Sequence, residues 1–271
     1  GENRYETVYE SVSDCGDQQV DERIEALKNG EGNQEALKWL DPTDPKIKSK
    51  EAFEDDHVDL CRKLVKKIEF SEEAKVHSLS DDQVDAIVKG INTRILLLQG
   101  PPGTGKTQTT AIEALLKIFN DKKDNPVVLV GANTHIAVDT LLLRIEKLLP
   151  LFNESLSEVF GETINPKIYK AYSEKYFIPL AEKSSILGLK ASGCVRIMNT
   201  AINEGPVVVG STTGSLLKLA KSLEGKPTFN SREGLRGDVL IVDEASMLVF
   251  PSFLALASLC SSEGVITLAG D

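Results

Sequence analysis

The stretch that most constrains the fold of this chain spans residues 94–119 and reads RILLLQGPPGTGKTQTTAIEALLKIF. An apolar run of strand length ends at Gly100, a turn rich in glycine and proline follows, and a helical pattern resumes at Lys106. Glycines in such a turn allow backbone conformations that aim several N–H groups at one anion, and the helix start adds the positive end of its dipole. The pattern G-x-x-x-x-G-K-[ST] therefore predicts a phosphate-binding loop over residues 100–107.

Apolar strands and helical patterns alternate from this loop to the end of the sequence. The strands are predicted at 94–99, 126–132, 167–172, 206–211, 238–244 and 265–270. Continuous apolar strands separated by helices are typical of a parallel sheet covered on both faces, so we predict an α/β fold with one such sheet. Residues 76–271 form this domain, with a helical insertion expected at about 174–204.

The segment before it, residues 1–75, is acidic and predicted to be helical. Two short helices are broken at Asn29-Gly30 and at the Asp-Pro pairs. Further on, apolar residues at spacings of three and four form one stripe, with two leucines beside it. The stripe consists of Val58, Cys61, Val65 and Ile68, and the flanking residues are Leu60 and Leu64. We expect this amphipathic helix to pack as a brace.

Composition narrows the class of protein. Of the 271 residues, 41% are hydrophobic and 27% are charged, as in globular proteins. No apolar window approaches the roughly 18 residues that a membrane span needs, and the N-terminus has no secretory pattern. The four cysteines lack a CxxC pair, so we expect buried cysteines and neither a disulfide frame nor a zinc site. This favours a reducing, intracellular location, cytoplasmic or nuclear. The net charge of −10 disfavours nucleic-acid binding unless N–H groups and hydroxyls grip the phosphates.

A second motif, DVLIVDEAS at 238–246, complements the loop. Asp243 and Glu244 follow four apolar residues, which places them at the carboxyl end of a buried strand, where open α/β sheets bind ligands. Lys106 is predicted to reach the β- and γ-phosphates of a nucleoside triphosphate, and Thr107 and Asp243 to hold Mg²⁺. Glu244 is predicted to polarise the water that attacks the γ-phosphate. Together the two motifs predict a hydrolase of a nucleoside triphosphate.

Further motifs carry a resemblance to a known family. The N-K-x-D of GTPases and the LSGGQ-type signature of ABC ATPases are absent. From about residue 79 to 271 the chain resembles the first RecA-like motor domain of superfamily 1 helicases, in the branch with the nonsense-mediated-decay helicases. LSDDQVDAI resembles the Q motif, LVGANTHIAVD motif Ia, VVVGSTTGS the next nucleic-acid motif, VDEASM the Walker B motif and LAGD the start of motif III. The chain departs from the family at residues 133–135 of motif Ia and at Met247, where glutamine is frequent.

The resemblance implies a helicase or translocase motor that couples ATP hydrolysis to the binding of single-stranded DNA or RNA. It also implies a second RecA-like domain beyond Asp271 that supplies arginine fingers, so we expect weak hydrolysis by these 271 residues alone. Loss of the γ-phosphate would be sensed near Gly270 and Asp271. The residues expected to contact nucleotide are Gln83, Gly100, Pro101, Pro102, Gly103, Thr104, Gly105, Lys106, Thr107, Gln108, Asp243 and Glu244. The residues expected to contact single-stranded DNA or RNA are Thr134, His135, Ser211 and Thr212.

Several alternatives stay open at the level of sequence. Ser80 and Gln83 also fit a capping box, so Gln83 either reads the adenine edge or caps a helix. The segments NTHIAVD and STTGSLLKL also look like helix N-caps, which use the same donors as phosphate binding. The alternative to a motor is a nucleotide-dependent scaffold that docks a protein partner through the acidic N-terminal helices.

Overall fold

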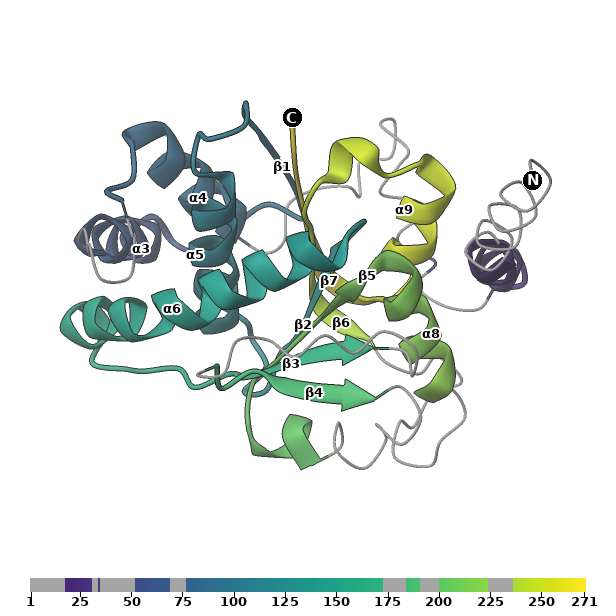
Figure 1. Cartoon of the computed structure of the whole chain (residues 1–271). Coiled ribbons are helices and arrows are strands. Elements are labelled where there is room, and N and C mark those ends of the chain that lie inside the picture. The colour runs from purple at the N-terminus through teal and green to yellow at the C-terminus, as the bar shows by residue number, and fades with distance from the viewer. Residues whose placement is uncertain are drawn as a thin grey trace.

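The computed structural model describes residues 18–30, 34, 52–68, 77–172, 184–190, 200–223 and 236–271 (Figure 1). Its helices are α3 (Asp55–Lys67), α4 (Asp81–Ile91), α5 (Lys106–Phe119), α6 (His135–Phe160), α8 (Thr213–Leu223), α9 (Phe250–Ala257) and the 3-10 turn η2 (Ala245–Met247). Residues 18–28 and 200–204 are also helical. The strands are β1 (Ile95–Gln99), β2 (Val127–Ala132), β3 (Lys167–Tyr172), β4 (Leu187–Lys190), β5 (Val207–Thr212), β6 (Gly237–Val242) and β7 (Cys260–Gly270).

The described strands form one seven-stranded sheet in the order β1-β7-β6-β2-β5-β3-β4. Every pairing in it is parallel. This confirms the predicted α/β fold, in which strands of both halves of the domain share one sheet. Because all strands run the same way, their carboxyl ends, and the loops that follow them, lie along one edge.

Helices cover both faces of the sheet (Figure 1). Helices α3 to α6 pack on one face, and α8 and α9 pack on the other. Side chains alternate along a strand, so Val128 of β2 faces the first layer while its neighbour Leu129 faces the second. Two hydrophobic cores therefore hold the sheet between them.

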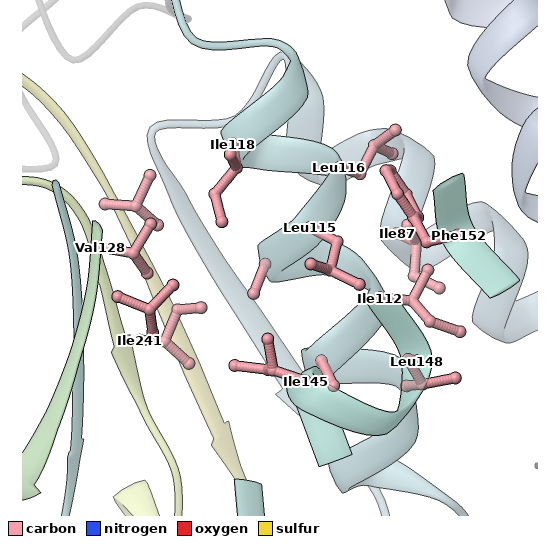
Figure 2. Close-up of a cluster of buried hydrophobic side chains, with 14 of the residues drawn as sticks. Ile87, Ile112, Leu115, Leu116, Ile118, Val128, Ile145, Leu148, Phe152 and Ile241 are labelled. Atoms are coloured by element: carbon pink, nitrogen blue, oxygen red, sulfur yellow. The ribbon is translucent and has the colours of Figure 1, made fainter. Parts of the chain in front are cut away.

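Helix α5, which follows the glycine-rich turn, lies inside the first of these cores. Its residues from 108 to 118 are all buried. Ile112 and Leu115 belong to the same cluster as Ile145 of α6 and Val128 of β2 (Figure 2). Full burial of a Leu or Ile side chain stabilises a fold by about 1.5–3 kcal/mol, so the helix is fixed on several sides.

The predicted brace is helix α3, which packs against α4 and α6. Cys61, Leu64 and Val65 are buried in the core that contains α5. Of the two leucines beside the stripe, Leu64 is buried and Leu60 is 39% exposed. At 3.6 residues per turn, Leu60 lies on the solvent side of the buried stripe.

Two elements differ from the sequence patterns. A proline usually ends a helix, whereas α6 continues through Pro150 to Phe160. Phe152 and Leu156 extend the buried stripe of Leu148 at spacings of four, which offsets the hydrogen bond that proline cannot donate. The helical insertion expected at 174–204 is wrong at its centre, where β4 pairs with β3 at the sheet edge.

The rest of that insertion, residues 174–183 and 191–199, lies outside the described residues, as does most of the segment before residue 52. Residues 200–204 are helical as expected. Within the described ranges, no helix has both the length and the hydrophobicity to cross a bilayer.

Candidate nucleotide and nucleic-acid site

The loop between β1 and α5 has the backbone that its glycines predict. Gly103 and Gly105 adopt φ angles of 82° and 80°, in the left-handed region that other residues rarely adopt. Gly105 is the N-cap residue of α5, so the helix dipole begins directly after the loop. Residues 101–105 are exposed, and Lys106 and Thr107 are half-buried. The loop is therefore open to a phosphate ligand.

The ammonium group of Lys106 is held inside the loop. Its Nζ atom donates to the carbonyl of Gly100, to that of Pro101 at 3.1 Å, and to Asp271 Oδ1 at 2.5 Å. Asp271 follows the end of β7, which lies between β1 and β6 in the sheet. Asp271 therefore lies between the glycine-rich loop and the acidic pair that follows β6.

The acidic pair has an unusual backbone. Glu244 adopts φ 55° and ψ 35°, the left-handed conformation, which costs a non-glycine residue about 1–2 kcal/mol. Asp243 Oδ1 accepts the N–H of Glu244 at 2.9 Å, and the N–H of Asp243 donates to the carbonyl of Gly131 at 2.9 Å. These bonds hold the sharp turn that follows β6.

Asp243 is nearly buried, with 8% of its surface exposed. Burial raises the pKa of its carboxyl group above the usual value, the Glu244 N–H opposes that rise, and the negative charge of Glu244 adds to it. The positive charge of Lys106 lowers this pKa, and the negative charge of Asp271 raises it. Carboxylate and hydroxyl oxygens suit Mg²⁺, so the donor set of Asp243 and Thr107 fits that ion.

A cavity of about 310 Å³ lies between the start of α4 and the glycine-rich loop. Its lining includes Gln83, Gly100, Pro101, Thr104 and Lys106 from the predicted set. It also includes Ser80, Asp82, Ala86, Leu98, Gln99 and Thr109, which the sequence motifs did not predict. Ala86 lies one helical turn after Gln83, so helical spacing is the signal that could have found it.

Gln83 caps its own helix and contacts the loop at the same time. Ser80 Oγ accepts the N–H of Gln83 at 3.3 Å, and Gln83 Oε1 accepts the N–H of Ser80 at 2.8 Å, which is the capping box. Gln83 Nε2 donates to the carbonyl of Thr104 at 2.8 Å. The amide side chain therefore links α4 to the loop, and its reading of an adenine edge stays a prediction.

Gln108 is engaged elsewhere. Its side-chain amide donates to the carbonyl of His77 at 2.5 Å and accepts the N–H of His77 at 3.2 Å. With 7% of its surface exposed, Gln108 ties the chain before α4 to helix α5. A nucleotide contact by this side chain stays a prediction.

The residues predicted to contact single-stranded nucleic acid follow the β-strands β2 and β5. Thr134 is exposed and caps α6 by accepting the N–H of Ala137 at 3.2 Å. His135 is half-buried, and its Nδ1 atom has no hydrogen-bond partner in the described residues. Thr212 is half-buried, and its hydroxyl donates to Ser215 Oγ at 3.0 Å. All three lie at the carboxyl edge of the sheet.

Ser211 is a correction. Its side chain is fully buried, and its hydroxyl donates to the carbonyl of Ala171 at 2.8 Å. Side chains alternate along β5, so Ser211 points into the fold while its neighbour Thr212 is partly exposed. The Ser211 hydroxyl therefore stabilises the contact between β5 and β3, and it is not exposed to a nucleic-acid ligand.

The fold and the loop define a RecA-like P-loop domain. Residues 78–204 match the model of a family described as an AAA domain. The DNA polymerase alpha-associated DNA helicase A of Saccharomyces cerevisiae is 37% identical over 73 residues, which are 27% of this chain and 10% of that protein. The regulator of nonsense transcripts 1 homolog of Neurospora crassa is 42% identical over 71 residues, 26% of this chain and 6% of that protein.

Among solved structures, the UvsW helicase from bacteriophage T4 aligns with 84% of this chain and 64% of its own, with a TM-score of 0.49 and 17% identity. The sequence matches span only a small part of the two relatives, 10% and 6% of their lengths. Over these stretches the chain is similar to the RecA-like domains of superfamily 1 helicases.

Proposed function

We propose that this domain binds Mg·ATP on the loop of residues 100–107 and couples its hydrolysis to single-stranded nucleic acid. The observation that carries the proposal is the common edge of the sheet. The loop follows β1, Asp243 and Glu244 follow β6, and Thr134 follows β2. Since β2 and β6 are paired neighbours, the acidic pair lies beside the exposed Thr134.

In the proposed reaction the oxygen of a water molecule bonds to the γ-phosphorus, and the bond from that phosphorus to the β–γ bridging oxygen breaks. Glu244 accepts the proton of the water, and ADP and phosphate leave. Lys106 exchanges its present partners, two carbonyls and Asp271, for phosphate oxygens. Asp243 and Thr107 would hold Mg²⁺, which neutralises phosphate charge.

Gly270 and Asp271 are suited to respond to the γ-phosphate. A Cβ atom on Gly270 would lie 3.0 Å from the backbone nitrogen of Ser246, so β7 and the turn after Glu244 are in close contact. A ligand that draws Lys106 from Asp271 therefore acts on the segment that carries Glu244. On the resemblance to two-domain motors, we propose that arginine fingers of a second RecA-like domain complete the site.

The test measures nucleotide binding and phosphate release separately. Binding of a fluorescent ATP analogue with Mg²⁺ is compared among the wild type, Lys106→Ala and Glu244→Gln. We expect Lys106→Ala to weaken binding about tenfold or more, since it loses a charge-assisted contact. Glu244→Gln should bind as the wild type does and lose about 100-fold or more in turnover. Normal hydrolysis by Glu244→Gln contradicts the role of Glu244 as the base.

Binding of nucleic acid is measured by the fluorescence anisotropy of labelled single-stranded DNA and RNA at low salt, in the presence of an ATP analogue. We expect binding that weakens steeply as salt rises, because phosphate contacts release counterions. Turnover should be slow and should rise when either polymer is added. Absence of binding to both polymers contradicts the motor proposal.

A further inference from the structure

Helix α3 carries a histidine and a cysteine on the same face. His57 and Cys61 lie four positions apart, so their side chains are neighbours on the helix. His57 Nε2 lies 3.5 Å from Cys61 Sγ and 2.5 Å from Oδ1 of Asn120, the C-cap residue of α5. Cys61 Sγ lies 3.8 Å from the same Oδ1 atom. An imidazole nitrogen, a sulfur and an amide oxygen therefore converge where α3 meets the end of α5.

The spacing of these three atoms is close to that of ligands around one metal ion. Tetrahedral zinc with bonds of about 2.0–2.3 Å separates its ligand atoms by about 3.3–3.7 Å. The two distances from sulfur, 3.5 Å and 3.8 Å, are near this range. The contact of His57 with Asn120 is shorter, so the amide would move by about 1 Å to admit a metal ion between them.

The surroundings of the cluster are apolar. The His57 ring stacks on Phe53 with centroids 4.7 Å apart, and it lies 5.5 Å from the ring of Phe160 and 6.4 Å from that of Phe119. Cys61 is fully buried and His57 is half-buried, so an ion would enter from the histidine side. A hydrophobic shell limits the access of solvent to a metal site.

Without a metal ion, the same side chains are held by hydrogen bonds. Asn120 Nδ2 donates to the carbonyl of Leu116 at 2.8 Å, which turns Oδ1 toward His57. Burial raises the pKa of the Cys61 thiol to about 11, so a metal ion that binds sulfur releases a proton to solvent. In the described residues, no three His, Cys, Asp or Glu side chains are grouped as a metal site, so the third ligand here is an amide.

We propose that His57, Cys61 and Asn120 bind one thiophilic cation of the zinc type, with water as the fourth ligand. The expectation against a zinc site was based on the lack of a CxxC pair, whereas here one cysteine pairs with a histidine. Thiolate and imidazole suit zinc and do not suit magnesium. Helix α5 has 14 residues, so the cluster lies about 20 Å from Lys106. The cation would join the brace to α5, independently of the proposed function.

The first test uses cobalt, which replaces zinc in such sites and gives a charge-transfer absorption when bonded to a thiolate. Every protein compared carries Cys15→Ser and Cys194→Ser, so that Cys61 and Cys260 are the thiols present. Excess Mg²⁺ occupies sites made of carboxylates. We expect cobalt to bind with thiolate absorption and zinc to displace it. Cys61→Ser should lose this absorption, whereas Cys260→Ser, in the other core, should keep it.

Two variants alter the other ligands and keep the thiol. His57→Gln retains an N–H donor for Asn120 but loses the imidazole, and it should weaken zinc binding about tenfold or more, since even partners of metal ligands contribute that much. Asn120→Asp replaces the amide oxygen by a carboxylate, which is a better zinc ligand, and it should tighten binding about tenfold. Competition with a chelating dye measures both affinities. Melting curves without metal verify that the variants are folded.

Zinc should also raise the melting temperature of the wild type and leave that of Cys61→Ser unchanged, because a ligand of the folded state stabilises it by mass action. A lack of thiolate absorption at stoichiometric cobalt overturns the inference, and so does equal absorption in Cys61→Ser. Zinc affinity in His57→Gln equal to that of the wild type also contradicts it, since a cluster held by hydrogen bonds alone does not need the imidazole.

Discussion

A buried ion pair joins the helix after the glycine-rich loop to the strand that ends beside it. Glu113 and Lys117 of α5 lie one turn apart with side chains 1% and 4% exposed, and their charged atoms are 2.6 Å apart. Thr267 of β7 donates to Glu113 at 2.7 Å and accepts from Lys117 at 2.6 Å. Glu113→Gln would leave the Lys117 ammonium buried without a counter-charge.

The expected loss is large. Removing one partner of a buried pair destabilises a protein by about 3–5 kcal/mol, against a total stability of roughly 5–15 kcal/mol. At about 2–4 °C per kcal/mol for a domain of this size, the melting temperature should fall by roughly 6–20 °C. Thermal and denaturant unfolding both measure this. The double variant Glu113→Leu with Lys117→Met should recover most of the loss, because apolar residues of similar volume avoid desolvation of charge.

The matched control is an exposed pair. Glu25 and Lys28 are 3.3 Å apart with side chains 63% and 67% exposed, so Glu25→Gln should change stability by under about 1 kcal/mol. If Glu113→Gln melts within about 2 °C of the wild type, or if the double variant is as unstable as the single one, the pair is not the link described.

Three further substitutions test packing and burial. Gly210→Ala would place a Cβ atom 2.6 Å from Leu142 of α6 and should destabilise by about 1–3 kcal/mol, whereas Gly214→Ala in α8 meets nothing within 4 Å and should be neutral or stabilising; denaturant midpoints separate the two. Asp243→Asn should raise the melting temperature of the metal-free protein near neutral pH while weakening Mg·ATP binding. Because burial raises the pKa of Asp243 in the folded state, its contribution to stability is present at low pH and lost as pH rises through that pKa. Melting curves from about pH 4 to 8 should therefore show the wild type losing stability relative to Asp243→Asn as pH rises, and a constant difference would refute this sign.

Local sequence predicted the elements whose signals are local. The phosphate-binding loop, the helix that begins at Lys106 and the apolar strands were predictable, because glycine conformation, helix capping and hydrophobic periodicity act over a few residues. The capping box of Ser80 and Gln83 is of the same kind. The continuation of α6 past Pro150 was not predictable from sequence. Proline disfavours a helix locally, whereas the burial of Phe152 that stabilises this helix depends on tertiary packing.

The arrangement of the site depended on neighbours that are distant in sequence. Only the order of strands places β7 between β1 and β6, and with it Asp271 beside Lys106. Only the pairing of β5 with β3 shows that Ser211 is buried, because a hydroxyl next to a strand end looks alike in sequence whether it faces solvent or a carbonyl. The contact of Thr134 with Glu244 spans 110 positions and no spacing rule predicts it. Sequence alone determined the glycine-rich turn and the helix that follows it, because their pattern is contained in eight consecutive residues, 100–107. Tertiary structure decided which acids, hydroxyls and cations surround it, because those distances are fixed by strand order and packing.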